Sequence, residues 1–258
     1  MATKRLKNRK KFILHNNDGY PDHYEKPKLV SVPSIKSQHF RINKVSPITS
    51  NQKLTFEAFN RGDHLMLHGL AGTGKTFLSL FLALNELLNF KQAQEKIYII
   101  RSVVPIRDMG FMPGNQKDKT RVYEAPYQSI CNELFGRGDA YEILKQKNII
   151  EFVSTSFVRG ITLNNCYVLV DEFANCNFHE LDTIITRTGR NCRLIFSGDF
   201  RQSDLTREQE RSGIRKFMHI IENLSGFSYV DFQKEDIVRS KLVRDYIITK
   251  DRYETRAG

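Results

Sequence analysis

Long apolar runs and paired cysteines are missing from this sequence, and each absence excludes a class of protein. No apolar stretch among the 258 residues approaches the roughly 20 residues of a membrane-spanning helix, so we expect no membrane segment. The basic N-terminus lacks the apolar stretch of a secretory signal. The four cysteines show neither a CxxC pair nor the spacing of a zinc site. We therefore expect reduced, mostly packed thiols in a cytoplasmic protein.

Acidic residues are scarce at the N-terminal end of the chain. The protein carries 40 Lys and Arg against 29 Asp and Glu, a formal net charge of +11. Eleven of these cations lie in residues 1–45, which hold three acids and few apolar residues. This composition predicts a basic extended arm over residues 1–45 rather than a domain. Such an arm either binds a polyanion, most often nucleic acid, or is a solvated tail, and both can hold because arms can order on binding.

From residue 46 onward, short apolar runs alternate with helical segments. This alternation is typical of a parallel sheet with helices on both faces, so we predict one α/β domain over residues 46–258. The polar segment 103–122 contains glycine and proline, and we predict a long loop there that is either functional or disordered. The predicted strands are 64–69, 96–102, 148–154, 166–171, 192–197 and 228–232. The predicted helical segments are 75–89, 123–135, 139–147, 178–188, 208–224 and 236–248.

The sequence GLAGTGKT, from Gly69 to Thr76, fits the phosphate-binding pattern G-x-x-x-x-G-K-[ST] at a strand-to-helix junction. Its glycines let backbone N–H groups turn toward a phosphate, and the following helix adds its unpaired N–H groups. Lys75 is expected to reach the β- and γ-phosphates of ATP, and Thr76 to coordinate Mg²⁺. A glycine-rich turn without a ligand is the competing explanation. The predicted nucleotide-binding residues of this loop are Gly69, Gly72, Thr73, Gly74, Lys75 and Thr76.

Two acids and an amide follow later predicted strands. Asp171 and Glu172 end the apolar run CYVLVDE, and Gln202 lies in SGDFRQSDL after the next strand. We expect Asp171 to hold Mg²⁺ through water and Glu172 to polarise the attacking water. Gln202 is expected to sense the γ-phosphate or orient that water, since an amide can donate and accept at once. Strands often end in Asp, and GDxxQ alone is a weak pattern, but their order after the loop favours function.

With these motifs in this order, the chain resembles the PhoH family of P-loop ATPases, whose core is similar to the first motor domain of superfamily 1 helicases. The resemblance covers about residues 46–249 and does not include the arm. It also rests on GFMPG, APYQSI, FVRGITLNN, TRTG and DIVRSKLVRDYI. It implies a RecA-like P-loop fold and ATP hydrolysis coupled to RNA or single-stranded DNA.

The helicase analogy also implies roles for three residues outside the loop. Gln52 would read the edge of adenine, and Arg101 and Arg159 would lie on the nucleic-acid face. The competing explanation for each arginine is a surface salt bridge.

A transition-state cation is not evident from the motifs. Phosphoryl transfer usually needs a cation against the developing charge, and the chain has no second P-loop-like core to bring one. We expect an arginine from a neighbouring copy, Arg239 in DIVR first, with Arg187, Arg190 and Arg244 as other candidates. This expectation and the resemblance both favour a ring, a homo-hexamer. Two other classes stay open: a small-molecule P-loop kinase, and a nucleotide-gated nucleic-acid-binding scaffold with slow ATPase activity.

Overall fold

A computed structural model of the protein describes residues 40–257 apart from 90–92, 104–115 and 201–207. Most of the predicted arm therefore lies outside the described residues, as do the GFMPG motif and Gln202. Within the described part of the chain, no helix is long and apolar enough to cross a membrane.

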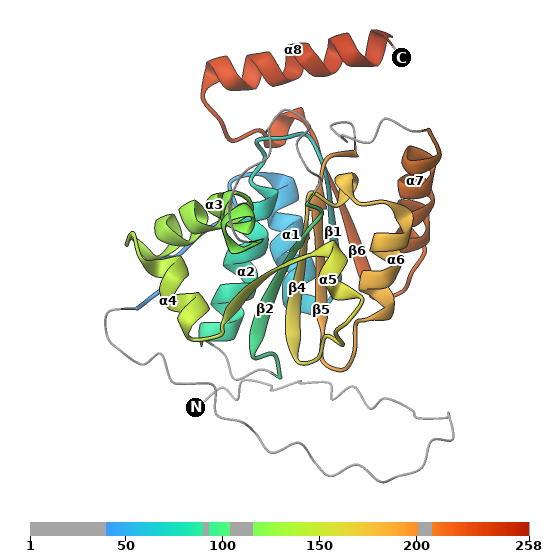
Figure 1. The fold of residues 1–258 in the computed structure, drawn as a ribbon. Coiled ribbons are helices and arrows are strands. Elements are labelled where there is room, and N and C mark those ends of the chain that lie inside the picture. The colour runs from blue at the N-terminus through green and yellow to red at the C-terminus, as the bar shows by residue number, and fades with distance from the viewer. Residues whose placement is uncertain (1–39, 90–92, 104–115, 201–207, 258) are drawn as a thin grey trace, which may run out of the picture. The chain divides into compact units, whose positions relative to one another are not determined.

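The described residues build a parallel sheet of six strands in the order β3-β2-β4-β5-β1-β6 (Figure 1). Its strands are β1 (His64–Gly69), β2 (Lys96–Arg101), β3 (Ile150–Ser154), β4 (Cys166–Asp171), β5 (Arg193–Gly198) and β6 (Phe227–Phe232). Every residue of β4 and β5 is buried, as is typical of parallel strands covered on both faces. The predicted parallel α/β fold is confirmed.

Helices cover both faces of the sheet, as Figure 1 shows. One layer contains α1 (Ser50–Arg61), α2 (Lys75–Asn89), α3 (Gln116–Phe135) and α4 (Ala140–Gln146). The other contains α5 (Thr155–Val158), α6 (Phe178–Thr186) and α7 (Glu208–Glu222). A short 3-10 helix η1 (Phe173–Asn175) follows β4, and η3 (Lys234–Asp236) precedes the last helix, α8 (Lys241–Ala257). The predicted phosphate loop and Asp171 lie at the carboxyl ends of β1 and β4, at one edge of the sheet.

Helix α1 has no counterpart among the predicted helices. Its buried positions are few and include the polar Thr55, so the helical periodicity of its apolar residues is weak. Its ends carry clear signals instead. The Thr49 side chain accepts a hydrogen bond from the backbone N–H of Gln52 (3.3 Å), as an N-cap does. Gly62 ends the helix in the left-handed conformation, with φ 99°.

Three predicted boundaries are wrong by more than two residues. Helix α8 ends at residue 257, nine residues beyond the predicted 248. Helix α3 begins at residue 116, so the C-terminal part of the predicted loop 103–122 is helical. Helix α8 begins at residue 241 and not at 236, because the chain first forms η3, where the Asp236 carboxylate accepts from the backbone N–H of Gln233 (2.9 Å). Arg239 therefore lies in the connection before α8 and not on that helix.

A buried arginine joins the first layer of helices to the sheet. Arg193 of β5 is 6% exposed, and its Nη1 lies 2.9 Å from the Glu86 carboxylate on α2. Its guanidinium also stacks on the Phe59 ring of α1 (3.7 Å) and donates to the backbone carbonyls of Phe59 and Asp63. One side chain thus ties α1 and the phosphate-loop helix α2 to the central strand.

Truncating this side chain should strongly destabilise the fold. Arg193→Ala is expected to lower the free energy of unfolding by about 3–5 kcal/mol, because it leaves the half-buried Glu86 without its partner. Urea denaturation measures the loss. The control is Lys53→Ala, which breaks an exposed pair with Glu57 and should cost less than about 0.5 kcal/mol. Equal small losses for both variants would contradict a role for Arg193 in stability.

Candidate nucleotide-binding site

The predicted phosphate loop joins β1 to α2. Gly69, Gly72 and Gly74 all have positive φ, which other residues rarely adopt. A Cβ at Gly69 would lie 2.1 Å from the Phe232 carbonyl oxygen on β6, so no larger residue fits there. A Cβ at Gly72 would lie 3.0 Å from the Cγ of Arg239. The loop therefore needs glycine for both its backbone conformation and its close neighbours.

Lys75 lies inside this loop and is 8% exposed. Its Nζ donates to the carbonyl oxygens of Gly69 (2.8 Å) and Leu70 (2.7 Å), and lies 3.3 Å from the Thr73 hydroxyl. These neutral acceptors hold the ammonium group at the centre of the loop. Phosphate oxygens carry more negative charge than peptide carbonyls, so they can replace these acceptors as partners of Lys75.

Thr76 and Asp171 form the next part of the site. The Thr76 hydroxyl donates to Asp171 Oδ1 (2.8 Å), and the Tyr127 hydroxyl donates to Asp171 Oδ2 (2.9 Å). Asp171 is the last residue of β4, and its side chain is buried. Thr76 lies in the first turn of α2, at the same edge of the sheet. The sequence predicts that Thr76 and Asp171 meet, and the structure brings them together.

The donor set at this position fits Mg²⁺. A hydroxyl and a carboxylate are hard oxygen ligands of the kind that this ion binds in nucleotide sites. Ser197 adds a second observation: its Cα pairs with that of Asp171 across β4 and β5, and its buried hydroxyl has no hydrogen-bond partner among the described residues. A buried polar group without a partner indicates a missing water, ion or ligand.

Glu172 follows β4 in a strained backbone conformation, with φ 51° and ψ 42°. Left-handed geometry is uncommon for glutamate and costs roughly 1–3 kcal/mol. Strain of this kind concentrates at functional sites. Glu172 is also less buried than Asp171, so the two neighbouring acids differ in their access to solvent.

Arg101 ends β2 beside the same acids. Burial alone would lower its pKa, but Tyr127, Asp171 and Glu172 outweigh burial and raise the pKa above the ordinary value. The helicase analogy assigns Arg101 to the nucleic-acid face. In the structure its electrostatic partners belong to the nucleotide site. Arg159, by contrast, follows α5 and is exposed.

Gln52 supports the loop from α1. Its Nε2 donates to the Thr73 carbonyl (3.1 Å), and its Oε1 accepts from the Ile48 backbone N–H (2.8 Å). The side chain is buried, and both ends of its amide contact the backbone. The helicase analogy assigns the adenine edge to this residue, and its described contacts instead stabilise the loop backbone.

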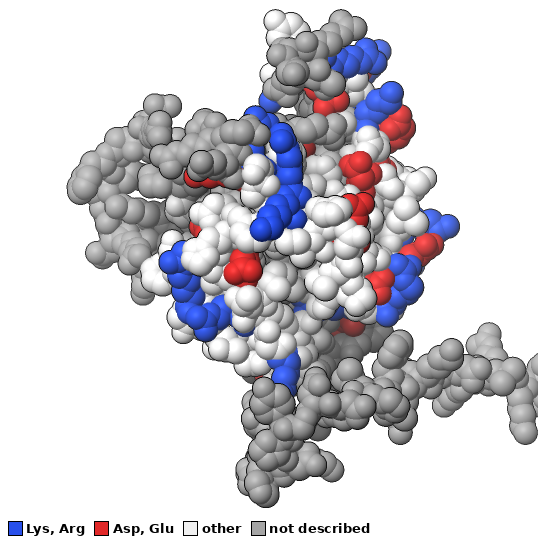
Figure 2. Space-filling model, turned by 90° about the vertical axis from the view of Figure 1, so that its right-hand side faces the viewer, with Lys and Arg blue, Asp and Glu red and all other residues white. Residues whose placement is uncertain are grey.

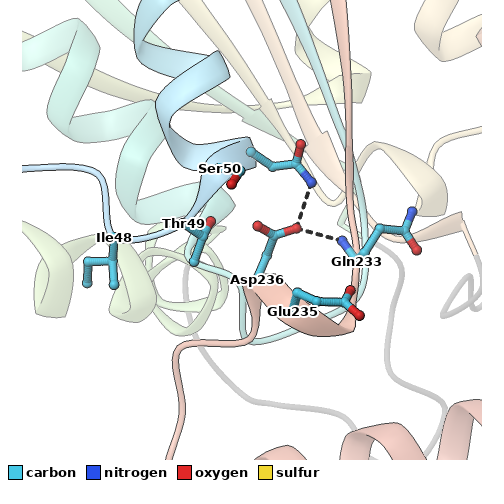
Figure 3. A pocket seen from close by; sticks show the side chains of 7 residues that line it. Ile48, Thr49, Ser50, Gln233, Glu235 and Asp236 are labelled. Carbon is cyan, nitrogen blue, oxygen red and sulfur yellow. Dashed lines mark hydrogen bonds between the residues drawn. The ribbon is translucent and has the colours of Figure 1, made fainter.

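A pocket of about 340 Å³ opens next to Gln52 (Figure 3). Asp236 lies in it and accepts from the backbone N–H of Gln233 (2.9 Å), as Figure 3 shows. The same carboxylate also accepts from Asn51 Nδ2 (2.7 Å). Polar groups therefore converge in a hollow between the start of α1 and the turn at η3. The lining residues are Ile48, Thr49, Ser50, Asn51, Gln233, Glu235 and Asp236.

Arg239 lies over the phosphate loop of its own chain. The backbone N–H of Val238 donates to the Gly72 carbonyl (3.0 Å), and the Arg239 Cγ and Nε lie close above Gly72. The residue is otherwise exposed. The sequence predicts that this arginine acts in a neighbouring copy, whereas the structure places it where it can reach its own loop.

Tyr127 and Ser197 are described residues of the site for which the sequence predicts no role. Tyr127 belongs to APYQSI, one of the motifs that carry the family resemblance. Ser197 precedes the glycine of SGDF. A tyrosine within a helix is usually a core residue, and only the fold reveals that this hydroxyl reaches Asp171. Gln202 lies outside the described residues.

Comparison with known proteins assigns the family. The PhoH family profile, described as "PhoH-like protein", matches residues 44–250. A PhoH-like protein of Bacillus subtilis is 31% identical over 79% of this chain and 63% of its own length. One of Synechocystis is 30% identical over 80% of this chain and 62% of its own length. The chain thus spans about three fifths of the length of these curated relatives.

Among solved structures, the large terminase of a thermophilic bacteriophage is similar with a TM-score of 0.48 and 13% identity, over 81% of this chain and 50% of that chain. At that TM-score the likeness supports no conclusion about this chain. The profile match, which covers most of the chain and every described site residue, leads to the identification: this chain belongs to the PhoH family.

Proposed function

We propose that this chain is an ATPase that binds ATP with Mg²⁺ and couples hydrolysis to the binding or remodelling of RNA or single-stranded DNA. One observation carries the ATPase proposal. The hydroxyl of Thr76 meets the carboxylate of Asp171 directly behind a glycine loop that encloses Lys75. Hydroxyl, carboxylate and ammonium are the groups that P-loop enzymes use on Mg²⁺ and the β- and γ-phosphates.

Each group has a defined task in this proposal. Lys75 exchanges its carbonyl partners for β- and γ-phosphate oxygens. Thr76 and Asp171 hold Mg²⁺, which when bound neutralises charge on those oxygens. Glu172 accepts a hydrogen bond from the attacking water and aims it at the γ-phosphorus. Gln202, outside the described residues, senses the γ-phosphate. The polar pocket beside Gln52 offers room for the nucleoside part of ATP.

Two arginines are candidates for the transition-state cation. Arg239 lies over Gly72 of its own chain, and Arg101 lies among Tyr127, Asp171 and Glu172. We favour Arg239, because the glycine loop that it covers is the part that cradles the phosphates. A cation supplied by the same chain no longer requires a neighbour for catalysis.

The proposed hexameric ring therefore rests on a different observation. Three of the large side chains that helix α8 exposes are Leu242, which is 81% exposed, Tyr246, which is 67% exposed, and Tyr253, which is 78% exposed. At about 100° per residue, these positions fall on one stripe of the helix. An exposed apolar stripe of this kind supports contact with a second copy of the chain. Light scattering with ATP and Mg²⁺ tests the assembly.

The nucleic-acid part of the proposal rests on charge. Arg159 is exposed, and the arm over residues 1–45 is strongly basic. On the face drawn in Figure 2, Lys and Arg side chains of the described residues stand beside Asp and Glu side chains and do not merge into one basic surface. We therefore assign the salt-sensitive part of the affinity to the arm.

Shortening the arm should flatten the salt dependence of binding. Deleting residues 1–12 removes six cations, and each lost phosphate contact changes the slope of log K against log salt by about 0.7 for single strands. Fluorescence anisotropy with a labelled oligo(U) RNA and an oligo(dT) DNA measures the slope. A full-length variant with the six cations changed to glutamine separates charge from length. An unchanged slope and affinity in both variants would assign the arm another task.

Phosphate release with and without RNA or single-stranded DNA separates the three functional classes. The ATPase proposal predicts turnover that nucleic acid stimulates. A nucleotide-gated scaffold binds nucleic acid tightly but turns over slowly under both conditions. A small-molecule kinase transfers phosphate to an acceptor and is indifferent to nucleic acid.

A further inference from the structure

Tyr127 connects the first layer of helices to the nucleotide site. It lies in α3, one residue after Pro126, and is completely buried, with its ring near that of Phe152 on β3 (centroids 5.9 Å apart). A buried tyrosine hydroxyl needs a partner, and this one donates to Asp171 Oδ2 (2.9 Å).

Among the described residues, two hydroxyl groups donate to the Asp171 carboxylate, one to each oxygen. Thr76 donates to Oδ1 and Tyr127 donates to Oδ2. The two donors differ in their tasks. Thr76 would also be a ligand of Mg²⁺, because a hydroxyl has one donor and two acceptor positions and its oxygen can bind the ion while its proton stays on Oδ1. Tyr127 would not bind the ion, so its role in the proposed chemistry is to hold Oδ2.

We propose that Tyr127 is the positioning residue of the metal site, which holds the Asp171 carboxylate in its metal-binding orientation. The inference rests on the proposed function, since it concerns how that function's Mg²⁺ is held. Arg101 lies on the same side, where its charge adds to the groups around Asp171 and Glu172. Such supporting hydrogen bonds fix the orientation of a ligand, and their loss commonly costs about 10- to 100-fold in metal affinity.

Tyr127→Phe tests this inference because it removes only the hydroxyl. Mn²⁺ serves as the probe, and the electron paramagnetic resonance signal of free Mn²⁺ is titrated with protein in the presence of ADP. We expect the variant to bind Mn²⁺ about 10- to 100-fold more weakly than the unaltered chain. In steady-state turnover, the Mg²⁺ concentration for half-maximal rate should rise by a similar factor, and kcat at saturating Mg²⁺ should largely recover.

Tyr141→Phe is the matched control. Tyr141 is also buried, and its hydroxyl donates to Glu124 (2.7 Å) rather than to Asp171. Both variants lose one buried tyrosine hydrogen bond, so a general loss of stability affects both, and thermal unfolding reports it. The inference predicts weaker Mn²⁺ binding in Tyr127→Phe alone.

The possible failures are distinguishable. If the unaltered chain binds Mn²⁺ with ADP and Tyr127→Phe binds it equally well, the positioning role is overturned while the nucleotide site stands. If Tyr141→Phe weakens Mn²⁺ binding as much as Tyr127→Phe, the effect is one of stability and the role is also overturned. If the unaltered chain binds neither nucleotide nor Mn²⁺, the proposed function itself fails, and the inference fails with it.

Discussion

Glu172→Gln is expected to bind ATP normally and to hydrolyse it about 10² to 10⁴ times more slowly. The amide keeps the size of the side chain but cannot accept a proton or draw one from the attacking water. Glutamine meets the same left-handed backbone at this position, so the strain and the fold should not change. Single-turnover phosphate release measures the hydrolytic step, and isothermal titration measures ATP affinity.

Asp171→Asn provides the contrast to this variant. It alters the carboxylate that contacts Thr76 and Tyr127, so it should weaken Mg²⁺-dependent ATP binding as well as turnover. The proposed roles require this difference between neighbouring acids. If Glu172→Gln loses ATP binding and Asp171→Asn retains it, the assignment of the two acids is reversed.

Arg239→Ala is expected to lose about 10³- to 10⁵-fold in turnover while binding ATP almost normally, if Arg239 is the transition-state cation. The side chain lies over Gly72 of its own chain, so its guanidinium can reach the phosphates that this loop binds. Truncation removes charge that acts on the transition state and leaves Lys75 in the ground-state site. Arg252→Ala, at an exposed position of α8, is the matched control and should retain most of the activity.

Mixing two inactive variants distinguishes an Arg239 that acts on the phosphate loop of its own chain from one that acts on the loop of a neighbour. Lys75→Ala lacks the phosphate-binding lysine, and Arg239→Ala lacks the cation. If Arg239 acts on its own loop, no subunit in a mixture has both groups, and activity should not return. Restored activity, in subunits shown to exchange, would contradict the placement over Gly72 and assign Arg239 to the neighbour's phosphates.

Much of the fold is predictable because its signals are local. Glycines at a strand-to-helix junction define the loop, and an apolar strand that ends in two acids places Asp171 at the same sheet edge. The contact between Thr76 and Asp171 follows from those two motifs and the sheet order. Helix α1 is absent from the prediction because its apolar periodicity is weak, although Thr49 and Gly62 mark its ends.

The remaining features depend on tertiary packing, which the linear pattern does not contain. The hydroxyl of Tyr127 finds Asp171 only because α3 packs against the sheet. The contact of Gln52 with the Thr73 carbonyl and the position of Arg101 beside the acids also depend on how the elements pack together. Arg239 lies outside its predicted helix because the Asp236 side chain caps a tight turn just before it.

Phosphate release by the unaltered chain and by Lys75→Ala, each with ATP and Mg²⁺ and with or without RNA or single-stranded DNA, tests the central claim most directly. The buried ammonium group lies at the centre of the loop, and its removal takes away the charge meant for the β- and γ-phosphates. The account predicts turnover by the unaltered chain, stimulation by nucleic acid, and loss of turnover with weakened ATP binding in Lys75→Ala. Near-normal turnover by Lys75→Ala would contradict it.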